Sequence, residues 1–299
     1  MGDTRRMAVI PLTTDPALVD AALADAVRAD SDTFAHRRYG DELAGPAVRA
    51  DPAGVIPLLL SHRSVRSFDG APLDDIVVDT LVAAAQSAST SSNLQSWSVV
   101  VVRDPAHKDA VATLAGDQQF IRDAPLFLVF VADWARGVAL ARGRGEASEG
   151  IGFLDSTLVA TVDAAIAAQN AVVAAEALGF GAVFVGAVRH HPRGVSEALG
   201  LPAAAFPVVG VAIGEPAADD RSEVKPRLPQ AVVRHDEQYR AADRDALEVY
   251  DSTLRGFNTS QGRAGGWIES VVARVRSRSA LHGRDRLRGV LTERGLPSD

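Results

Sequence analysis

Residues 163–189 read DAAIAAQNAVVAAEALGFGAVFVGAVR, which predicts a long helix followed at once by a strand. We expect the helix over residues 156–178, because the apolar pattern continues upstream and Gly179 suits the left-handed residue that ends a helix. Alanines surround the helix axis almost completely. A helix that is apolar all round is buried between packed neighbours, either within one subunit or between two subunits. The strand is expected at residues 182–185.

Other segments alternate between strand and helix patterns on both sides of this unit. A continuous apolar run at residues 125–132 predicts a buried strand. Glycines recur throughout residues 135–155, which predicts a mobile loop. The remaining patterns predict strands at 97–102 and 206–214, and helices at 16–28, 74–85, 107–115 and 192–199.

The composition narrows the classes of protein to which the chain can belong. With 299 residues, 47% of them hydrophobic and 23% charged, it is long enough for one large domain or two small ones. The net charge of −7 argues against a nucleic-acid or anionic-membrane partner. There is no cysteine, which excludes disulfides, thiol catalysis and sulfur-ligated metals. With no apolar run long enough for a secretory signal or a membrane span, we expect a cytoplasmic protein.

Two cationic motifs lie far apart in the sequence, with a serine-rich loop between them. They read HRSVRSF at residues 62–68 and KPRLP at 225–229, and the loop reads SASTSSNLQ at 87–95. Arginine, lysine and hydroxyl donors suit the oxygens of a phosphate. Pro226 disfavours a helix at Lys225, and alternate residues of an extended strand point the same way. Each motif alone is equally typical of an exposed helix end, a basic linker or a polar loop, so a phosphorylated cofactor is a hypothesis that depends on their combination.

Two further patterns, a glycine-rich segment and a pair of histidines, are weak evidence for a nucleotide site or a metal site. The glycines of residues 179–186 suggest a dinucleotide-binding loop, but they precede a strand instead of opening a helix, so we reject that interpretation. His190 and His191 have no carboxylate or further histidine at metal-ligand spacing, which indicates a solvated strand end and no metal site.

Taken together and in this order, the segments resemble the nitroreductase superfamily, and especially the bacterial NADPH-dependent, oxygen-insensitive nitroreductases and flavin reductases. The resemblance covers about residues 58–250. It rests on the two cationic motifs, on ASTSSNLQSWS at 88–98, on TLAGDQQFI at 113–121 and on residues 163–189. It implies an α+β fold with a central mixed, mostly antiparallel sheet wrapped by helices, in an intertwined homodimer. It also divides the chain into an N-terminal extension (1–54), an FMN-binding core (55–241) and a C-terminal arm (242–299) that packs on the core or on the partner subunit.

The resemblance assigns the cationic motifs to the phosphate end of FMN. His62, Arg63 and Ser64 match ligands of the phosphate and the ribityl chain. Lys225 and Arg227 match a clamp on the same phosphate.

Further roles concern the flavin ring itself. Arg66 matches the cation beside flavin N1 and O2, and it is the one side chain expected to act on the flavin's electronics. Thr90 and its serine neighbours match the loop beneath the cofactor, and Gln118 matches a hydrogen-bonding partner of the pyrimidine edge. The backbone over the flavin, with an N–H near N5, matches Phe184, Val185, Gly186 and Ala187. The family often has Gly-Gly where this chain has Gly186 and Ala187, so the methyl group is expected to narrow the pocket face.

The function implied by the resemblance is an FMN-dependent oxidoreductase. NADPH, with NADH as the other candidate, delivers hydride to the flavin and leaves, and an electron-poor acceptor then takes two electrons in a ping-pong mechanism. The acceptor would be a nitroaromatic compound, a quinone or free flavin. Arg263 and Arg278 are the candidates for binding the NADPH 2′-phosphate. The alternative is a flavin-binding carrier or redox sensor with incidental turnover, because flavin binding and flavin reduction use the same residues.

Overall fold

The structure is a computed structural model that describes residues 54–297. The helix predicted at residues 16–28 lies outside the described residues. The chain divides into two compact units, each built from two segments. The first unit contains residues up to His62 together with residues 223–273, and the second contains residues 63–222 and 274–299. The predicted boundaries at 54/55 and 241/242 stay a prediction.

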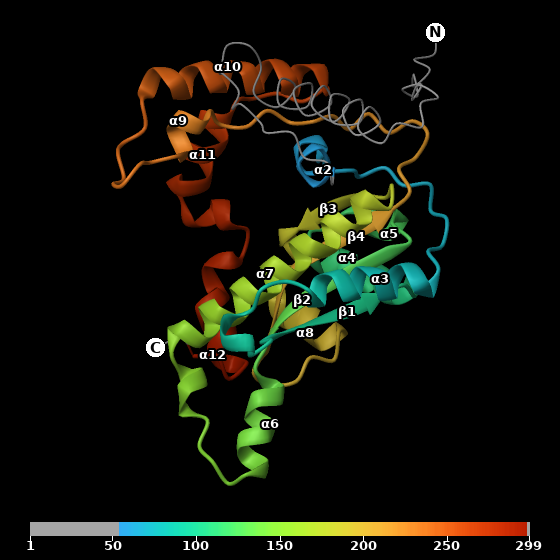
Figure 1. The fold of residues 1–299 in the computed structure, drawn as a ribbon, viewed down its shortest axis with the longest axis vertical. Helices are drawn as coiled ribbons and strands as arrows, with labels where there is room; N and C mark the ends of the chain where they lie inside the picture. Colours follow the sequence, from blue (N-terminus) through green and yellow to red (C-terminus); the bar gives the residue numbers. More distant parts are fainter. Residues whose placement is uncertain (1–53, 298–299) are drawn as a thin grey trace, which may run out of the picture. The chain divides into compact units, whose positions relative to one another are not determined.

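A four-stranded antiparallel sheet forms the centre of the second unit, in the order β1-β2-β4-β3 (Figure 1). The strands are β1 (Trp97–Val102), β2 (Leu126–Asp133), β3 (Gly181–Val185) and β4 (Ala205–Gly214), close to their predicted positions. An isolated parallel bridge joins Ser64 to Ala182 of β3. The antiparallel ladder with this parallel bridge agrees with the expected mixed, mostly antiparallel sheet.

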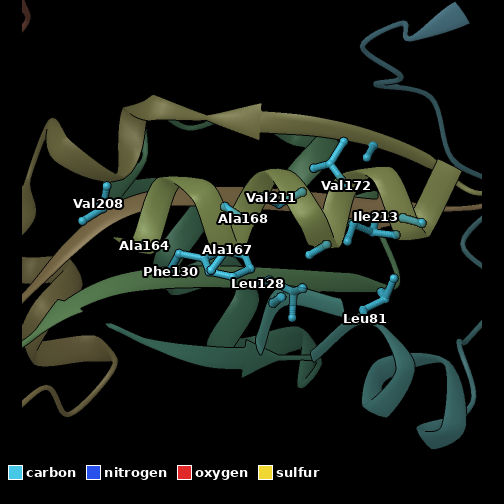
Figure 2. Packing of buried hydrophobic residues seen from close by; sticks show 14 of the residues in the cluster. Leu81, Leu128, Phe130, Ala164, Ala167, Ala168, Val172, Val208, Val211 and Ile213 are labelled. Atoms are coloured by element: carbon cyan, nitrogen blue, oxygen red, sulfur yellow. The ribbon is translucent and has the colours of Figure 1, made fainter. Parts of the chain in front are cut away.

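Strand β2 is buried on both faces of the sheet, and its side chains alternate between two core clusters. Leu128 and Phe130 face the helices α3 (Asp75–Gln86) and α7 (Leu154–Ala177), as Figure 2 shows. Phe127 and Val129 face the opposite cluster, to which α4 (Pro105–Leu114), α5 (Gln119–Asp123) and α8 (Pro192–Ala198) contribute. The period of two in a strand produces this division. An unbroken apolar run therefore builds a sheet covered by helices on both sides.

Helix α7 is the long helix expected from residues 163–189, and the prediction of its position is correct within two residues. Gly179 has φ +90°, so it ends the helix in the left-handed conformation that glycine favours. The buried side of the helix is mostly alanine, so its backbone lies close to the sheet (Figure 2). By length and composition alone α7 could cross a membrane, but this buried side belongs to the largest core cluster of the unit.

The prediction of a mobile loop at residues 135–155 is wrong for the first half of this segment, which forms helix α6 (Ala135–Gly143). Leucine, alanine and arginine favour a helix there, and the cost of Gly137, about 1 kcal/mol, is offset by packing. Trp134, at the N-cap of α6, donates its indole N–H to the Ser156 carbonyl at 2.8 Å. Val138 packs with Phe206 and with Val290 of helix α12 (Leu287–Glu293). Tertiary contacts therefore order the segment.

The C-terminal part of the chain, expected to form an arm over residues 242–299, is largely helical. It forms α10 (Arg244–Ser260), α11 (Trp267–Arg276), two short 3₁₀ turns (Arg278–Leu281 and Arg284–Arg286) and α12. The described part of the first unit also contains α2 (Val55–Ser61) and α9 (Gln230–Val233). Its small core is formed by Tyr250 and Leu254 with Leu228, Phe257 and Trp267.

Candidate flavin site

The serine-rich loop is held in place by a buried carboxylate on α7. Asp163 is 2% exposed and accepts hydrogen bonds from the Thr90 hydroxyl (2.6 Å) and from the backbone N–H groups of Ser91 and Ser96 (both 3.1 Å). The Thr90 hydroxyl in turn accepts from the Gln95 N–H at 2.9 Å. Asp163 thus satisfies donors on both sides of the loop. The sequence signal for this anchor was an acid in the middle of an alanine-rich helix, which the pattern of the sequence alone does not mark as a site residue.

The loop has a backbone that residues other than glycine seldom adopt. Ser92, Asn93 and Gln95 have φ values of 48°, 56° and 52°. Each such conformation costs on the order of 1 kcal/mol and persists only where the surroundings impose it. Ser91 and Ser92 are exposed as a result. Hydroxyl groups of this kind can donate to a ligand that lies against the loop.

A hollow of about 370 Å³ lies between the loop and the outer side of α7. Its polar wall includes Ser89, Thr90 and Ser91, and its apolar wall includes Leu158 and Val162. An apolar wall facing a few polar groups is typical of a small-molecule site.

The first cationic motif runs beside β3 and turns its two arginines outward. Val65 is buried, and its N–H donates to the Ala182 carbonyl at 3.1 Å. A Cβ at Gly181 would lie 2.7 Å from the Val65 side chain, so only glycine lets the two segments approach this closely. Arg63 donates to the Ser222 hydroxyl at 3.1 Å and lies 3.8 Å from the Asp220 carboxylate. Burial of Val65 therefore determines which side of the motif faces outward.

Arg66 and Gln118 both lie next to Phe120 of α5. The Arg66 guanidinium is 5.9 Å from the centre of the Phe120 ring, within range of a cation–π contact. Gln118 is the N-cap residue of α5, and its side-chain N–H donates to the Ala115 carbonyl at 2.9 Å. The structure thus brings two of the predicted ring contacts into one neighbourhood.

The segment 184–187 closes β3 and opens a 3₁₀ turn, Gly186–Arg189. Phe184 is exposed and Val185 is buried, so successive side chains of the strand point to opposite faces of the sheet. Ala187 packs against the core cluster that contains Val188. The expected narrowing of the pocket by its methyl group stays a prediction.

The side chain of Arg189 joins this turn to strand β4. Strand β4 has an irregularity at Val208, a residue that pairs with neither neighbouring strand. The Arg189 guanidinium donates a hydrogen bond to the carbonyl of Val208. Burial, and then the charge of Arg284, lower the pKa of Arg189. A half-buried cation thus fixes the turn that begins at Gly186.

The remaining predicted residues, His62, Lys225 and Arg227, belong to the first unit. Arg227 is exposed, and its guanidinium donates to the Lys225 carbonyl at 3.2 Å. The hydroxyl of the buried Tyr250 donates to the Pro226 carbonyl at 3.1 Å and holds the motif on α10. Burial raises the pKa of Tyr250, which keeps this donor protonated. Arg63, Ser64 and Arg66 lie in the second unit, so the convergence of all these residues on one phosphate stays a prediction.

Comparison with known proteins identifies the family. The family model described as "Nitroreductase family" matches residues 59–215, and the model of its C-terminal domain matches residues 225–299. The chain belongs to the nitroreductase family. The α+β fold and the superfamily expected from the motifs are therefore confirmed. The family match also extends beyond residue 250, where the resemblance by motif ended.

Individual members of the nitroreductase family match over most of their length. An FMN reductase [NAD(P)H] of Bacillus subtilis is 40% identical over 73% of this chain and 90% of its own length. An NADPH-flavin oxidoreductase of Vibrio harveyi is 35% identical over 76% of this chain and 93% of its own. Among solved structures, a nitroreductase of B. subtilis aligns over 82% of this chain and all of its own, with 34% identity and a TM-score of 0.77.

Proposed function

We propose that this member of the nitroreductase family is an FMN-dependent oxidoreductase that takes hydride from NADPH and passes two electrons to an electron-poor acceptor. Relatives named FMN reductase, NADPH-flavin oxidoreductase and oxygen-insensitive NADPH nitroreductase match it over 83–93% of their length. The structural observation that carries the proposal is the serine loop, which Asp163 holds against an apolar hollow. The acceptor is a nitroaromatic compound, a quinone or free flavin.

The donor set of the second unit fits FMN. A planar apolar ring needs an apolar wall, and α7 supplies one with Leu158 and Val162. A ribityl chain and a phosphate need short donors, which Ser64 and the exposed serines of the loop supply. The Thr90 hydroxyl is already bonded to Asp163, so we assign it to shaping the loop and assign the contacts with FMN to its serine neighbours.

We assign the phosphate to His62, Arg63, Lys225 and Arg227, on the strength of the two cationic motifs. Arg63 uses one of its N–H groups on Ser222, and a guanidinium has five. The remaining N–H groups are sufficient for a bidentate contact with phosphate.

When bound, FMN supplies hydride acceptance at N5 and two-electron transfer, and the chain orients it and stabilises charge. Arg66 places a permanent positive charge at the N1–O2 edge, where negative charge collects on reduction. Gln118 binds the pyrimidine edge with the part of its amide not bonded to Ala115. The segment Phe184, Val185, Gly186 and Ala187 would hold the ring with a backbone N–H near N5. No side chain acts as a nucleophile.

We propose a homodimer that forms through the outer side of α7, with the flavin at the subunit interface, since Leu158 and Val162 also line the proposed flavin wall. Leu154, Leu158, Val162 and Ile166 recur every fourth residue along it and are 39–53% exposed. Such a spacing places them in one stripe along the helix. The predicted dimer helix is thus retained, but the side opposite the stripe belongs to the sheet, since Val172 is fully buried within the chain.

We also propose that Arg263 binds the NADPH 2′-phosphate. Both predicted candidates are exposed, but Arg278 is paired with Asp285 at 2.5 Å, whereas Arg263 has no ion pair within residues 54–297. Together with the absence of cysteine, a reaction that uses NADPH supports a cytoplasmic location.

The test of the proposed function is the absorbance and turnover of the purified protein. A flavin spectrum, bleached by NADPH and restored by a nitroaromatic compound faster than by air, would support the enzyme. A bound flavin that NADPH does not reduce would instead support the carrier or sensor. A colourless protein that does not retain added FMN would refute both.

A further inference from the structure

A second pocket lies in the same unit as the sheet, away from the serine loop. It has a volume of about 650 Å³, within the range of small-molecule sites. One wall is the segment from His190 to Gly194, at the start of α8, and the other is the C-terminal segment from His282 to Glu293.

The two walls are fitted to each other closely. Gly283 has φ +85°, and a Cβ there would lie 2.9 Å from the His190 carbonyl oxygen. The rings of His190 and His282, one from each wall, have their centres 5.7 Å apart. A glycine is thus required where the C-terminal segment passes His190, and the pocket is a built feature of the fold.

The side chains that line this pocket are mostly basic. His190, His191, His282 and Arg286 all border it. Glu293 is the only carboxylate among the residues that form it in the described part of the chain, and Arg193 binds that carboxylate through contacts of 2.6 and 3.0 Å. The ion pair leaves no negative charge to balance the histidines and Arg286.

Charges behind the pocket wall have the same sign. Burial, and then Arg284, His282, His191 and Arg189, lower the pKa of His190. The nearby carboxylate of Asp285 is paired with Arg278. Within residues 54–297, no ion pair offsets Arg189, Arg284 or Arg286. The arginines in and behind the wall, Arg286, Arg189 and Arg284, therefore give the pocket a positive potential that an anion would stabilise, while the lowered pKa keeps His190 neutral near pH 7.

We propose that this pocket binds a small phosphorylated molecule, with Arg286, His282 and His190 contacting the phosphate. A phosphate group has three acceptor oxygens and close to two negative charges, which match the charge of Arg286 and the N–H donors of two histidine rings better than a single carboxylate does. The volume leaves room for the organic part of the ligand. The inference rests on this pocket alone and is independent of the proposed flavin chemistry.

The test uses the full-length protein with its flavin and takes pyrophosphate as the probe. In a protein with ¹³C-labelled histidine, the ring signals of His190 and His282 should move and saturate with a dissociation constant of roughly 1 mM or below. Arg286→Ala should weaken this binding at least about tenfold, which corresponds to about 1.4 kcal/mol. Arg288→Ala is the matched control, because Arg288 is an exposed arginine of the same helical segment that does not line the pocket.

Sodium sulfate at equal ionic strength separates binding from screening, and the circular dichroism spectrum of each variant reports on its folding. Histidine signals that move linearly without saturation would overturn the proposal. Equal affinity for pyrophosphate in the Arg286 and Arg288 variants would also overturn it, since the anion would then bind elsewhere, including at the flavin or NADPH site.

Discussion

Replacing Asp163 with asparagine tests the anchor on which the candidate flavin site depends. The carboxylate accepts from the Thr90 hydroxyl, from Ser91 N–H and from Ser96 N–H, and it is 2% exposed. Asparagine has the same shape but only one acceptor oxygen. Whichever way the amide turns, its NH₂ group faces at least one backbone N–H that now has no acceptor.

The size of the effect follows from these contacts. A hydrogen bond to a charged group contributes about 1.5–3 kcal/mol, and a buried donor left unpaired costs about 1–3 kcal/mol. We therefore expect Asp163→Asn to lower the free energy of unfolding by roughly 2–4 kcal/mol. For a protein of this size that corresponds to a fall in Tm of about 5–10 °C. The loop should also relax from its left-handed conformations, weakening FMN about tenfold or more.

The assay is thermal unfolding of the flavin-free variant, followed by FMN titration at a temperature where it is folded. Asp155→Asn is the matched control, since Asp155 is an exposed acid in the first turn of the same helix. Its loss should cost less than about 1 kcal/mol through the helix dipole. Equal Tm and equal FMN affinity for the Asp163 variant and the wild type would refute the anchoring role.

Three further predictions concern the ring, the dimer and the nucleotide. Arg66→Gln should retain much of the FMN yet lower its midpoint potential by about 30 mV for each 1.4 kcal/mol of lost differential stabilisation. Potentiometric titration measures this, and an unchanged potential with FMN simply lost would assign Arg66 to the phosphate. Val162→Glu should give a folded monomer by light scattering, whereas Val172→Glu should fail to fold, because it buries a charge in the core. If the Val162 variant is still a dimer, the interface is not formed by the outer side of α7. Arg263→Ala should raise KM about tenfold or more for NADPH and leave KM for NADH unchanged, because it removes a charge-assisted contact with the 2′-phosphate. An equal rise with both nucleotides would exclude a 2′-phosphate contact.

The regular elements of the core could be predicted because local pattern and tertiary environment agree there. The apolar run at residues 125–132 has no polar side chain that could face water, so both of its faces had to be covered. Gly179 marked the end of α7 by its own conformational preference. The prediction for residues 135–143 was wrong because local pattern and tertiary environment disagree there. The glycines suggested a loop, whereas contacts of Trp134 and Val138 with distant residues stabilise a helix.

By itself the sequence determined the family, the order of the elements and the residue types available for a phosphorylated cofactor. Only the tertiary structure decided which side of α7 is buried within the chain, because apolar residues surround the axis, and the alanine side is covered while the stripe of larger side chains stays exposed. It also decided that Asp163 shapes the serine loop and that Thr90 is bonded to it. A hydrogen bond joins atoms far apart in the chain, and sequence spacing carries no information about such a distance. The pocket around His190 could not be predicted for the same reason, since His282 and Arg286 are about 90 residues away in the sequence and meet His190 only in the folded chain.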